Sequence, residues 1–116
     1  MLFVCYPKCT TCQNAEKYLI ENNISFDKRD IKQDNPSVEE LKIWHKKSNL
    51  PLKRFVNTSG LQYKNLNLKD KLPNMTEQEQ LDLLATDGML VKRPLLIGTD
   101  FVVVGFKEQE WDMVIK

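Results

Sequence analysis

The chain has 116 residues, 41% of them apolar and 28% charged, which fits one domain with a hydrophobic core of its own. Its net charge of +1 gives no electrostatic reason to expect direct binding to nucleic acid or to an anionic membrane. No stretch approaches the roughly 20 apolar residues that span a bilayer, and the N-terminus lacks the pattern of a signal peptide. Three cysteines, an odd number, do not suit a secreted disulfide scaffold, so we expect a cytoplasmic protein.

The first part of the chain predicts a strand, a helix and a second strand. Residues 2–6 form a continuous apolar run, which is typical of a strand buried on both faces. Residues 10–23 predict a helix with Cys12 on its apolar face. Apolar and polar residues alternate in part over residues 24–31, which predicts the second strand. Because strands joined through a helix run parallel, we expect these two strands to pair in parallel.

Two capping boxes mark the beginnings of helices in the middle of the chain. A serine or threonine is followed three residues later by a glutamate at Ser37 and again at Thr76, and an apolar stripe follows each pair. Gly88 is a natural C-terminal stop for the second of these helices. We expect residues of about 36–88 to form a helical insertion packed on the sheet.

The last part of the chain predicts a hairpin and a final helix. Two apolar runs, residues 95–97 and 101–104, flank a Gly-Thr-Asp turn and predict antiparallel strands. Residues 107–115 predict a helix with Trp111 facing inward. The chain therefore predicts an α/β fold, a mixed central sheet flanked by helices, in a single domain spanning residues 1–116.

The pair Cys9 and Cys12 carries the strongest chemical signal in the sequence. A free cysteine with a pKa near ~8.5 is mostly protonated at neutral pH, and a helix N-terminus lowers that pKa through unpaired N–H groups and the helix dipole. Cys9 stands where the first helix begins, beside Lys8, whose charge adds positive potential. Cys12 follows one helical turn later, within reach of a mixed disulfide at Cys9. The spacing predicts Cys9 as the nucleophile and Cys12 as the resolving thiol.

Metal binding is the main alternative for these two cysteines. A C-x-x-C pair can supply half of a structural zinc site, which usually needs four ligands, but the chain has no second such pair. Its single histidine, His45, falls within a predicted amphipathic helix and reads as part of a solvated face. We therefore expect no metal site. Cys5, inside the first strand, is expected to be a small buried residue.

Arg93 and Pro94 stand directly before the apolar run of the predicted hairpin. Pro94 fits either an ordinary strand start or a cis peptide bond in a tight turn. Arg93 fits either a surface charge at a loop end or a group beside the thiols, where its guanidinium would stabilise a thiolate or hold an anionic substrate.

Three motifs in this order resemble the arsenate reductase (ArsC)/Spx family: Tyr-Pro-Lys-Cys-Thr-Thr-Cys at 6–12, Asn-Thr-Ser-Gly at 57–60 and Lys-Arg-Pro-Leu at 92–95. The resemblance covers essentially the whole chain. It implies a thioredoxin-like fold, a nucleophilic Cys9 and a cis Pro94 after Arg93. We take Cys9, Cys12 and Arg93 as the catalytic residues. The expected substrate-binding residues are Lys8, Thr10, Thr11, Arg93 and Pro94.

The chain departs from the arsenate reductases that it resembles. Those enzymes hold the oxyanion with three arginines, whose positions fall near Asn57, at Arg93 and near Gly105 here, so only Arg93 matches. Arg54 is the one nearby candidate for a substitute. Each missing guanidinium removes charge-assisted hydrogen bonds worth about 1.5–3 kcal/mol apiece. Such enzymes also lack a resolving cysteine at the position of Cys12. Both departures argue against arsenate as the natural substrate.

Two functions from different classes follow. The first is a thiol–disulfide oxidoreductase that needs no bound metal or organic cofactor and receives electrons from glutathione, thioredoxin or glutaredoxin. The second, implied by the resemblance, is an Spx-like redox-sensing transcriptional regulator that binds the RNA polymerase alpha subunit rather than nucleic acid directly. The polymerase-contacting segment of such regulators includes a glycine, and residues 46–50 contain none. A glutaredoxin-linked arsenate reductase is the third and least favoured interpretation.

Overall fold

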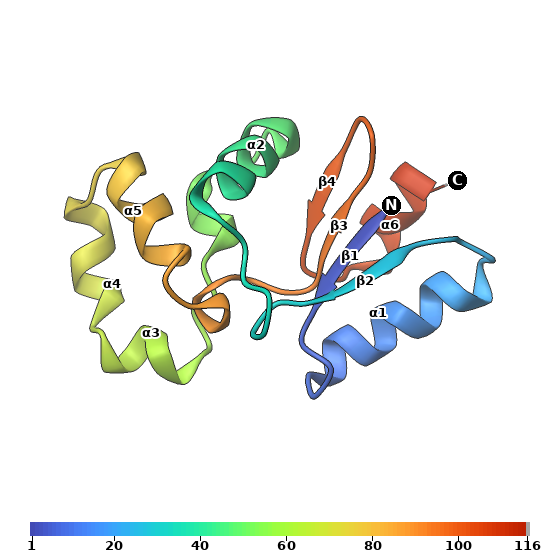
Figure 1. Ribbon diagram of the computed structural model, residues 1–116, viewed down its shortest axis with the longest axis horizontal. Coiled ribbons are helices and arrows are strands. Elements are labelled where there is room, and N and C mark those ends of the chain that lie inside the picture. The colour runs from blue at the N-terminus through green and yellow to red at the C-terminus, as the bar shows by residue number, and fades with distance from the viewer. Residues whose placement is uncertain (116) are drawn as a thin grey trace.

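The computed structural model describes residues 1–115 and has a four-stranded mixed sheet at its centre (Figure 1). The strands are β1 (Leu2–Cys5), β2 (Asp27–Asp30), β3 (Leu95–Ile97) and β4 (Val102–Val104). They lie in the order β2-β1-β3-β4, with β1 parallel to β2 and both other pairs antiparallel. The predicted parallel pair, the hairpin and the mixed sheet are thus confirmed.

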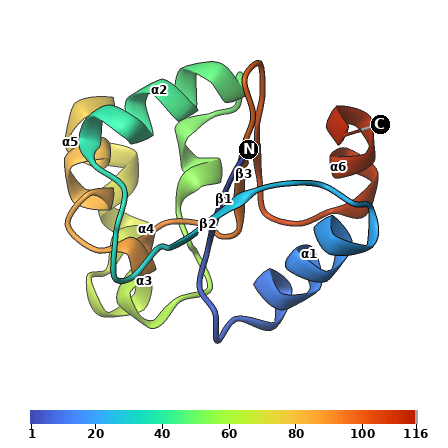
Figure 2. The same cartoon turned by 45° about the vertical axis from the view of Figure 1, so that its right-hand side comes forward.

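Helices cover both faces of this sheet. The α-helices are α1 (Thr10–Glu21), α2 (Val38–Ser48), α3 (Leu61–Asn65), α4 (Leu68–Lys71), α5 (Glu77–Leu84) and α6 (Glu108–Ile115), and the 3-10 helices are η1 (Leu52–Phe55), η2 (Leu72–Asn74) and η3 (Gly88–Leu90). Helices α1 and α6 lie together on one side of the sheet (Figure 2). The segment from α2 to α5 lies on the other side (Figures 1 and 2).

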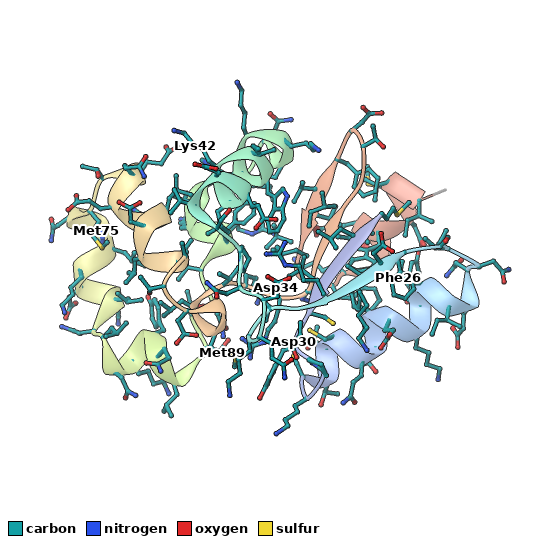
Figure 3. All side chains as sticks on the ribbon, viewed as in Figure 1. Phe26, Asp30, Asp34, Lys42, Met75 and Met89 are labelled. Carbon is teal, nitrogen blue, oxygen red and sulfur yellow. The ribbon has the colours of Figure 1, made fainter. Side chains whose placement is uncertain are left out.

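Alternation along the strands divides the core into two clusters, one on each face. On β1, Phe3 and Cys5 pack toward α1 and α6, while Val4 packs toward α2 and α5. Trp111 at the centre of the first cluster is fully buried, as predicted. Figure 3 shows the side chain of Phe26 in the half that contains α1, and that of Met75 at the opposite end, near α4 and α5.

Both predicted capping boxes are present. The side chains of Ser37 and Thr76 accept from the N–H groups of Glu40 and Glu79, at 3.1 Å each, and the two glutamates accept from the capping N–H groups. Gly88, however, is not the stop for α5, which ends with Ala85 as its C-cap. A Cβ at Gly88 would lie 1.7 Å from the Ile31 carbonyl oxygen, so this glycine permits a close approach of two backbone segments.

Strand β2 is shorter than the predicted strand of residues 24–31. Its four residues are charged and at least partly exposed, and it pairs only with β1, which makes it an edge strand. The flanking apolar residues belong to the two cores: Ile24 packs in the cluster of α1 and α6, and Ile31 is fully buried in the other. The apolar residues that led to the prediction of a longer strand are therefore buried outside the sheet, in the two core clusters.

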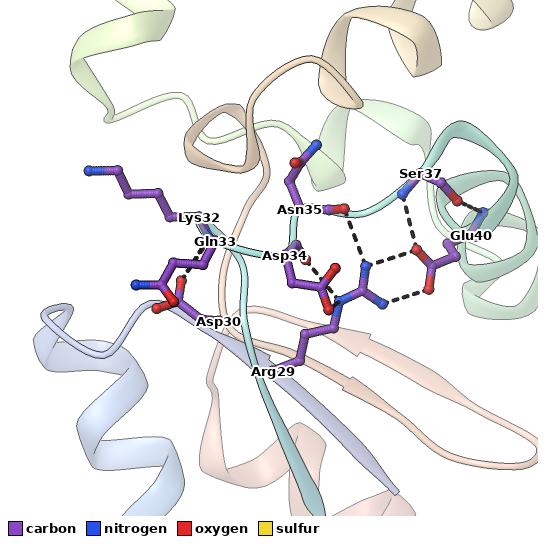
Figure 4. A network of polar contacts seen from close by, with 8 residues as sticks. All are labelled: Arg29, Asp30, Lys32, Gln33, Asp34, Asn35, Ser37 and Glu40. Carbon is purple, nitrogen blue, oxygen red and sulfur yellow. Dashed lines mark hydrogen bonds and ion pairs between the residues drawn. The ribbon is translucent and has the colours of Figure 1, made fainter.

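Arg29 of β2 joins the sheet edge to α2 (Figure 4). Its guanidinium donates to both carboxylate oxygens of Glu40, at 2.6 and 2.9 Å, and to the carbonyls of Asp34 and Asn35. It also lies over the ring of Trp44, with 5.8 Å between Cζ and the ring centroid. This network holds the pKa of Glu40 at about 2, chiefly through the hydrogen bonds from Arg29.

The helices from α2 to α5 all lie between β2 and β3 in the chain, where the insertion of residues 36–88 is predicted. The insertion and the single domain of residues 1–116 stay predictions, and Lys116 lies outside the described residues. Within residues 1–115, no helix has both the length and the apolar character that crossing a membrane requires.

Candidate active site

Cys9 occupies the N-cap position of α1, directly before the first helical turn. Its backbone is extended, with φ −84° and ψ 124°, and its carbonyl accepts from the N–H of Gln13 at 3.0 Å. Its own N–H donates to the carbonyl of Tyr6 at 2.9 Å, and the Gln13 side chain donates to the carbonyl of Pro7 at 3.0 Å. These contacts fix the loop from β1 to α1, so the Cys9 sulfur is held where the free N–H groups of the helix point.

The environment of Cys9 favours its thiolate. Burial of this half-buried side chain raises its pKa, but polar groups near the sulfur act in the opposite direction. They are the N–H and thiol of Cys12, the N–H of Thr11 and the guanidinium of Arg93, and the net result is a Cys9 pKa below the ordinary value. Cys9 is therefore more thiolate-like than a free cysteine at neutral pH.

Cys12 has the opposite environment, one that favours the protonated thiol. Its side chain is 2% exposed, and burial is the largest of the influences that raise its pKa to about 12. The N–H of Tyr6 donates to its sulfur at 3.4 Å and lowers the pKa, while the charge and hydrogen bond of Cys9 raise it further. Cys5 is buried as predicted, at 1% exposure, and desolvation raises its pKa to about 11. All three cysteines are free thiols in this structure.

Arg93 precedes a cis peptide bond to Pro94 and faces the same loop as the thiols. Its Cζ lies 5.3 Å from the centroid of the Tyr6 ring, a cation–π contact. Two guanidinium nitrogens, Nε and Nη1, are buried and have no hydrogen-bond partner among the described residues. Because buried donors of this kind are costly to leave unsatisfied, they are suited to an anionic group that enters the site.

A cavity of about 470 Å³ opens beside Cys9. Four cationic side chains line it, and no carboxylate does so within residues 1–115: the cations are Arg54, Lys92, Arg93 and Lys107. Residues from the loops after η1 and β4 complete the wall. The cavity therefore combines a thiolate-stabilising environment with an excess of positive charge, which suits a negatively charged substrate.

The structure brings together only part of the predicted site. Thr11 and Arg93 line the cavity with Cys9, whereas Cys12 is buried and does not line it. Lys8 and Thr10 are exposed and Pro94 is buried, and none of these three lines the cavity. Their predicted contacts with substrate stay predictions.

Asn57 and Gly105, near which the resemblance implies arginines, both line the cavity. Asn57 is 9% exposed, and its amide donates to the carbonyl of Met89 at 3.2 Å. Gly105 has φ +75°, which strongly favours glycine, and its carbonyl accepts from the Trp111 indole at 3.0 Å. Arg54 does line the cavity, as the candidate substitute for a missing arginine should.

The lining residues that were not singled out from the sequence include Ser59, Lys92, Phe106 and Lys107. Ser59 and Lys92 belong to the motifs that carry the family resemblance, and this was the one signal that could have identified them. Phe106 and Lys107 have no local signal, because only the return of the chain after β4 brings them to Cys9.

The described residues contain no group of three or more histidine, cysteine, aspartate or glutamate side chains that could hold a metal ion. His45 is not on a solvated face, contrary to the prediction. Its side chain is 18% exposed, its ring packs edge-on against Phe55, and its Nδ1 lies 3.5 Å from a carboxylate oxygen of Glu77.

A mixed sheet with a cysteine at the N-terminus of the first helix and a cis proline before β3 defines a thioredoxin-like fold with a cysteine-based site. A model of the ArsC family matches residues 5–114. The chain is 51% identical over 112 residues to the uncharacterized protein YusI of Bacillus subtilis. The matched residues cover 97% of this chain and 95% of YusI. The chain belongs to the ArsC family.

Two further relatives show how wide this similarity is. The crystal structure of a protein from Bacteroides fragilis that is related to the ArsC family has 59% identity and a TM-score of 0.95, covering 97% of this chain and 95% of that one. The global transcriptional regulator Spx of Enterococcus faecalis is 31% identical over 105 residues, which is 90% of this chain and 77% of Spx. One of the relatives of this chain is therefore named a regulator.

Proposed function

We propose that the protein is a thiol–disulfide oxidoreductase of the reducing cytoplasm, with Cys9 as the nucleophile and Cys12 as the resolving thiol. The observation that carries the proposal is the contrast between the two sulfurs. Cys9 is half-buried beside a basic cavity with its pKa lowered, whereas Cys12 is buried one turn later with its pKa raised to about 12. Such a pair separates the thiol that attacks from the thiol that resolves.

In the first step, the Cys9 thiolate attacks one sulfur of a disulfide, of a glutathionylated thiol or of a similar oxidised substrate. A Cys9–sulfur bond forms, the substrate's sulfur–sulfur bond breaks, and the second sulfur leaves as a thiolate that takes up a proton. Arg93 stabilises the attacking thiolate and an anionic part of the substrate, because its guanidinium lowers the Cys9 pKa and presents two unpartnered buried nitrogens within the described residues.

In the second step, Cys12 loses its proton and attacks the Cys9 sulfur of the mixed disulfide. The Cys9–Cys12 disulfide forms and the remaining substrate sulfur leaves as a thiolate. Burial is the main reason that the Cys12 pKa is high, but the charge and hydrogen bond of Cys9 contribute to it. Both contributions disappear once Cys9 is bonded to substrate, so Cys12 becomes easier to deprotonate when it is needed. Glutathione, thioredoxin or glutaredoxin then reduces the disulfide and restores both thiols.

Mass spectrometry of three variants tests this mechanism. The protein is mixed with glutathione disulfide, and its adducts are followed over time. We expect the unchanged protein to form an intramolecular disulfide, Cys12→Ser to accumulate a mixed disulfide at Cys9, and Cys9→Ser to form neither. Cys5→Ala is the matched control and should react like the unchanged protein, since Cys5 has no part in the mechanism.

The same reaction gives the reduction potential. A glutathione redox titration should place the Cys9–Cys12 pair near the cytosolic range of about −220 to −320 mV. A Cys9→Ser variant that reacts as fast as the unchanged protein, or the absence of a Cys9–Cys12 disulfide at every glutathione ratio, would contradict the proposal.

A redox-sensing regulator is the second candidate, and the 31% identity to the regulator Spx favours it. In this case the Cys9–Cys12 disulfide changes a binding surface, and the partner is the RNA polymerase alpha subunit. Binding of the isolated C-terminal domain of that subunit to the reduced and to the oxidised protein tests this candidate. Affinity that depends on oxidation, without turnover of glutathione disulfide, supports the regulator, whereas turnover without binding supports the enzyme.

A further inference from the structure

A second cavity, of about 650 Å³, adjoins the cavity beside Cys9. Arg54 and Lys92 line both cavities, so the two share a wall. The second one extends away from the thiols over the segment from α3 to α5. Its volume lies in the range of about 300–1,000 Å³ that is typical of ligand sites.

The interior of the second cavity is apolar. Val56 and Leu68 are almost completely buried, at 3% and 2% exposure, while Tyr63 and Leu72 remain partly exposed beside them. Gln80 is held in place at the wall, because its side-chain amide donates to the carbonyls of Leu72 at 3.3 Å and Met75 at 3.2 Å. An apolar side chain that enters this cavity would therefore meet a preformed apolar surface.

The charged residues around this cavity are all of one sign. Lys53, Arg54, Lys69 and Lys92 line it, and no aspartate or glutamate within residues 1–115 does so. The whole chain is nearly balanced, with 17 basic and 16 acidic residues, so this excess is local. Charge complementarity therefore selects a negatively charged occupant with an apolar part.

We propose that the two adjoining cavities bind one acidic protein segment, with its oxidised cysteine at Cys9 and a neighbouring apolar side chain in the second cavity. This inference rests on the proposed function and names its substrate class: oxidised cysteines in acidic, apolar-flanked segments of proteins. An extended chain advances about 3.3–3.6 Å per residue, so a few residues connect neighbouring cavities. Glutathione alone would satisfy the first cavity but has no apolar side chain for the second.

Peptide disulfides that release a coloured thiolate test the proposal. The probe is a nine-residue peptide that carries leucine, aspartate and glutamate on each side of a central cysteine, which is disulfide-bonded to 5-thio-2-nitrobenzoate. The reference is N-acetylcysteine amide carrying the same disulfide. At substrate concentrations well below saturation, we expect the second-order rate constant to be about tenfold higher for the peptide than for the reference. Burial of one leucine side chain is favourable enough to account for a difference of about tenfold. Replacing the leucines by alanine, or the acidic residues by lysine, should remove most of this gain.

Two lysines of α4 form a matched pair of variants. Lys69→Glu reverses a charge that lines the second cavity, and Lys71→Glu reverses one that lines neither cavity; both side chains are exposed. We expect Lys69→Glu to lose most of the gain for the acidic peptide and to react normally with the reference, while Lys71→Glu keeps both rates. Higher salt should diminish the gain.

The outcomes separate this inference from the proposed function. Equal rates for the leucine and alanine peptides, or equal losses in the two lysine variants, would overturn the inference, while a normal reaction of the reference with Cys9 would leave the oxidoreductase mechanism standing. Failure of the reference to react with Cys9 would overturn the proposed function itself.

Discussion

The two faces of the sheet are built in different ways. The face covered by α1 and α6 packs aromatic rings edge to face around Trp111, with Phe3, Tyr18 and Phe106 at 4.9 to 6.3 Å between ring centroids. The face covered by α2 to α5 packs mainly aliphatic side chains beneath its helices and carries the exposed lysines of the second cavity. The first face holds the thiols in place through the backbone, and the second offers side chains that can contact a substrate.

The two halves of the molecule differ in how well they should tolerate substitutions. Cys9 is placed by a helix N-cap and Gly105 by a positive φ, so few substitutions could preserve that geometry. Lys53 and Lys69 are exposed side chains on the helical half, where substitutions change the charge of the surface at little cost in stability. We therefore expect variants in the two halves to affect different measurements.

The largest expected effects come from the two tryptophans, one in each half. Trp111→Ala and Trp44→Ala should each lower the free energy of unfolding by about 3–5 kcal/mol, because the side chains are 0% and 5% exposed. Only Trp111→Ala should also change the alkylation rate of Cys9, because Trp111 holds Gly105 at the wall of the cavity. Urea denaturation and iodoacetamide labelling measure the two effects. Trp111→Phe is the milder control, and an equal change of Cys9 reactivity in Trp44→Ala would refute the separation.

A glycine substitution tests the contact between the loop after β2 and the end of the helical half. Gly88→Ala places a Cβ 1.7 Å from the Ile31 carbonyl oxygen, so the backbone must move, and we expect a loss of about 1–3 kcal/mol. In Gly60→Ala the new Cβ would lie 2.6 Å from the side-chain amide nitrogen of Asn57. Because a side chain can move more easily than backbone, the loss of stability should be smaller than in Gly88→Ala. Thermal and urea unfolding compare the two. Equal losses would show that the close backbone approach at Gly88 is not what requires glycine there.

The ion pair between Arg29 of β2 and Glu40 of α2 should contribute about 1 kcal/mol to the free energy of unfolding, in a way that depends on pH. This amount is reduced for the partial exposure of Glu40. The folded pKa of Glu40, about 2, lies below the unfolded value of about 4.3, so its contribution is complete above the unfolded pKa and is lost as the pH falls toward 2. Glu40→Gln should therefore be less stable than the unchanged protein at pH 7, and the difference should diminish below pH ~4.

Glu79→Gln is the matched control for this pair. Glu79 belongs to the other capping box, and its pKa is lowered by hydrogen bonds from Thr76 rather than by an arginine. Urea unfolding at several pH values should show a smaller pH-dependent difference for this variant. A Glu79→Gln difference as large as that of Glu40→Gln would mean that the cap, not Arg29, accounts for the effect.

The smallest expected effect concerns Arg93 and the acidity of Cys9. Arg93→Ala should raise the Cys9 pKa part of the way toward its ordinary value, because the guanidinium contributes less to the lowering than the hydrogen bonds from Cys12 and Thr11. The pH dependence of iodoacetamide labelling measures this pKa. Arg54→Ala, which removes a cation that lines the same cavity without a bond to the sulfur, should leave the Cys9 pKa closer to that of the unchanged protein.

The sequence by itself determined the parts of this protein that depend on neighbouring residues. Both capping boxes, the hairpin turn and the position of Cys9 before the first helix depend on contacts within a few positions. The three motifs, taken in order, further identified the family. The spacing of nearby residues singled out the two cysteines as candidates, whereas Arg93 was assigned to the site through the family resemblance.

Only the tertiary structure decided the features that join distant segments. It showed why Gly88 is glycine, why β2 stops short of its apolar neighbours, and how Arg29 connects the sheet to α2. It also brought Lys92 and Lys107 to the cavity of Cys9. The physical reason is that such contacts depend on how the chain returns to the same place after tens of residues, which no short pattern of residues specifies.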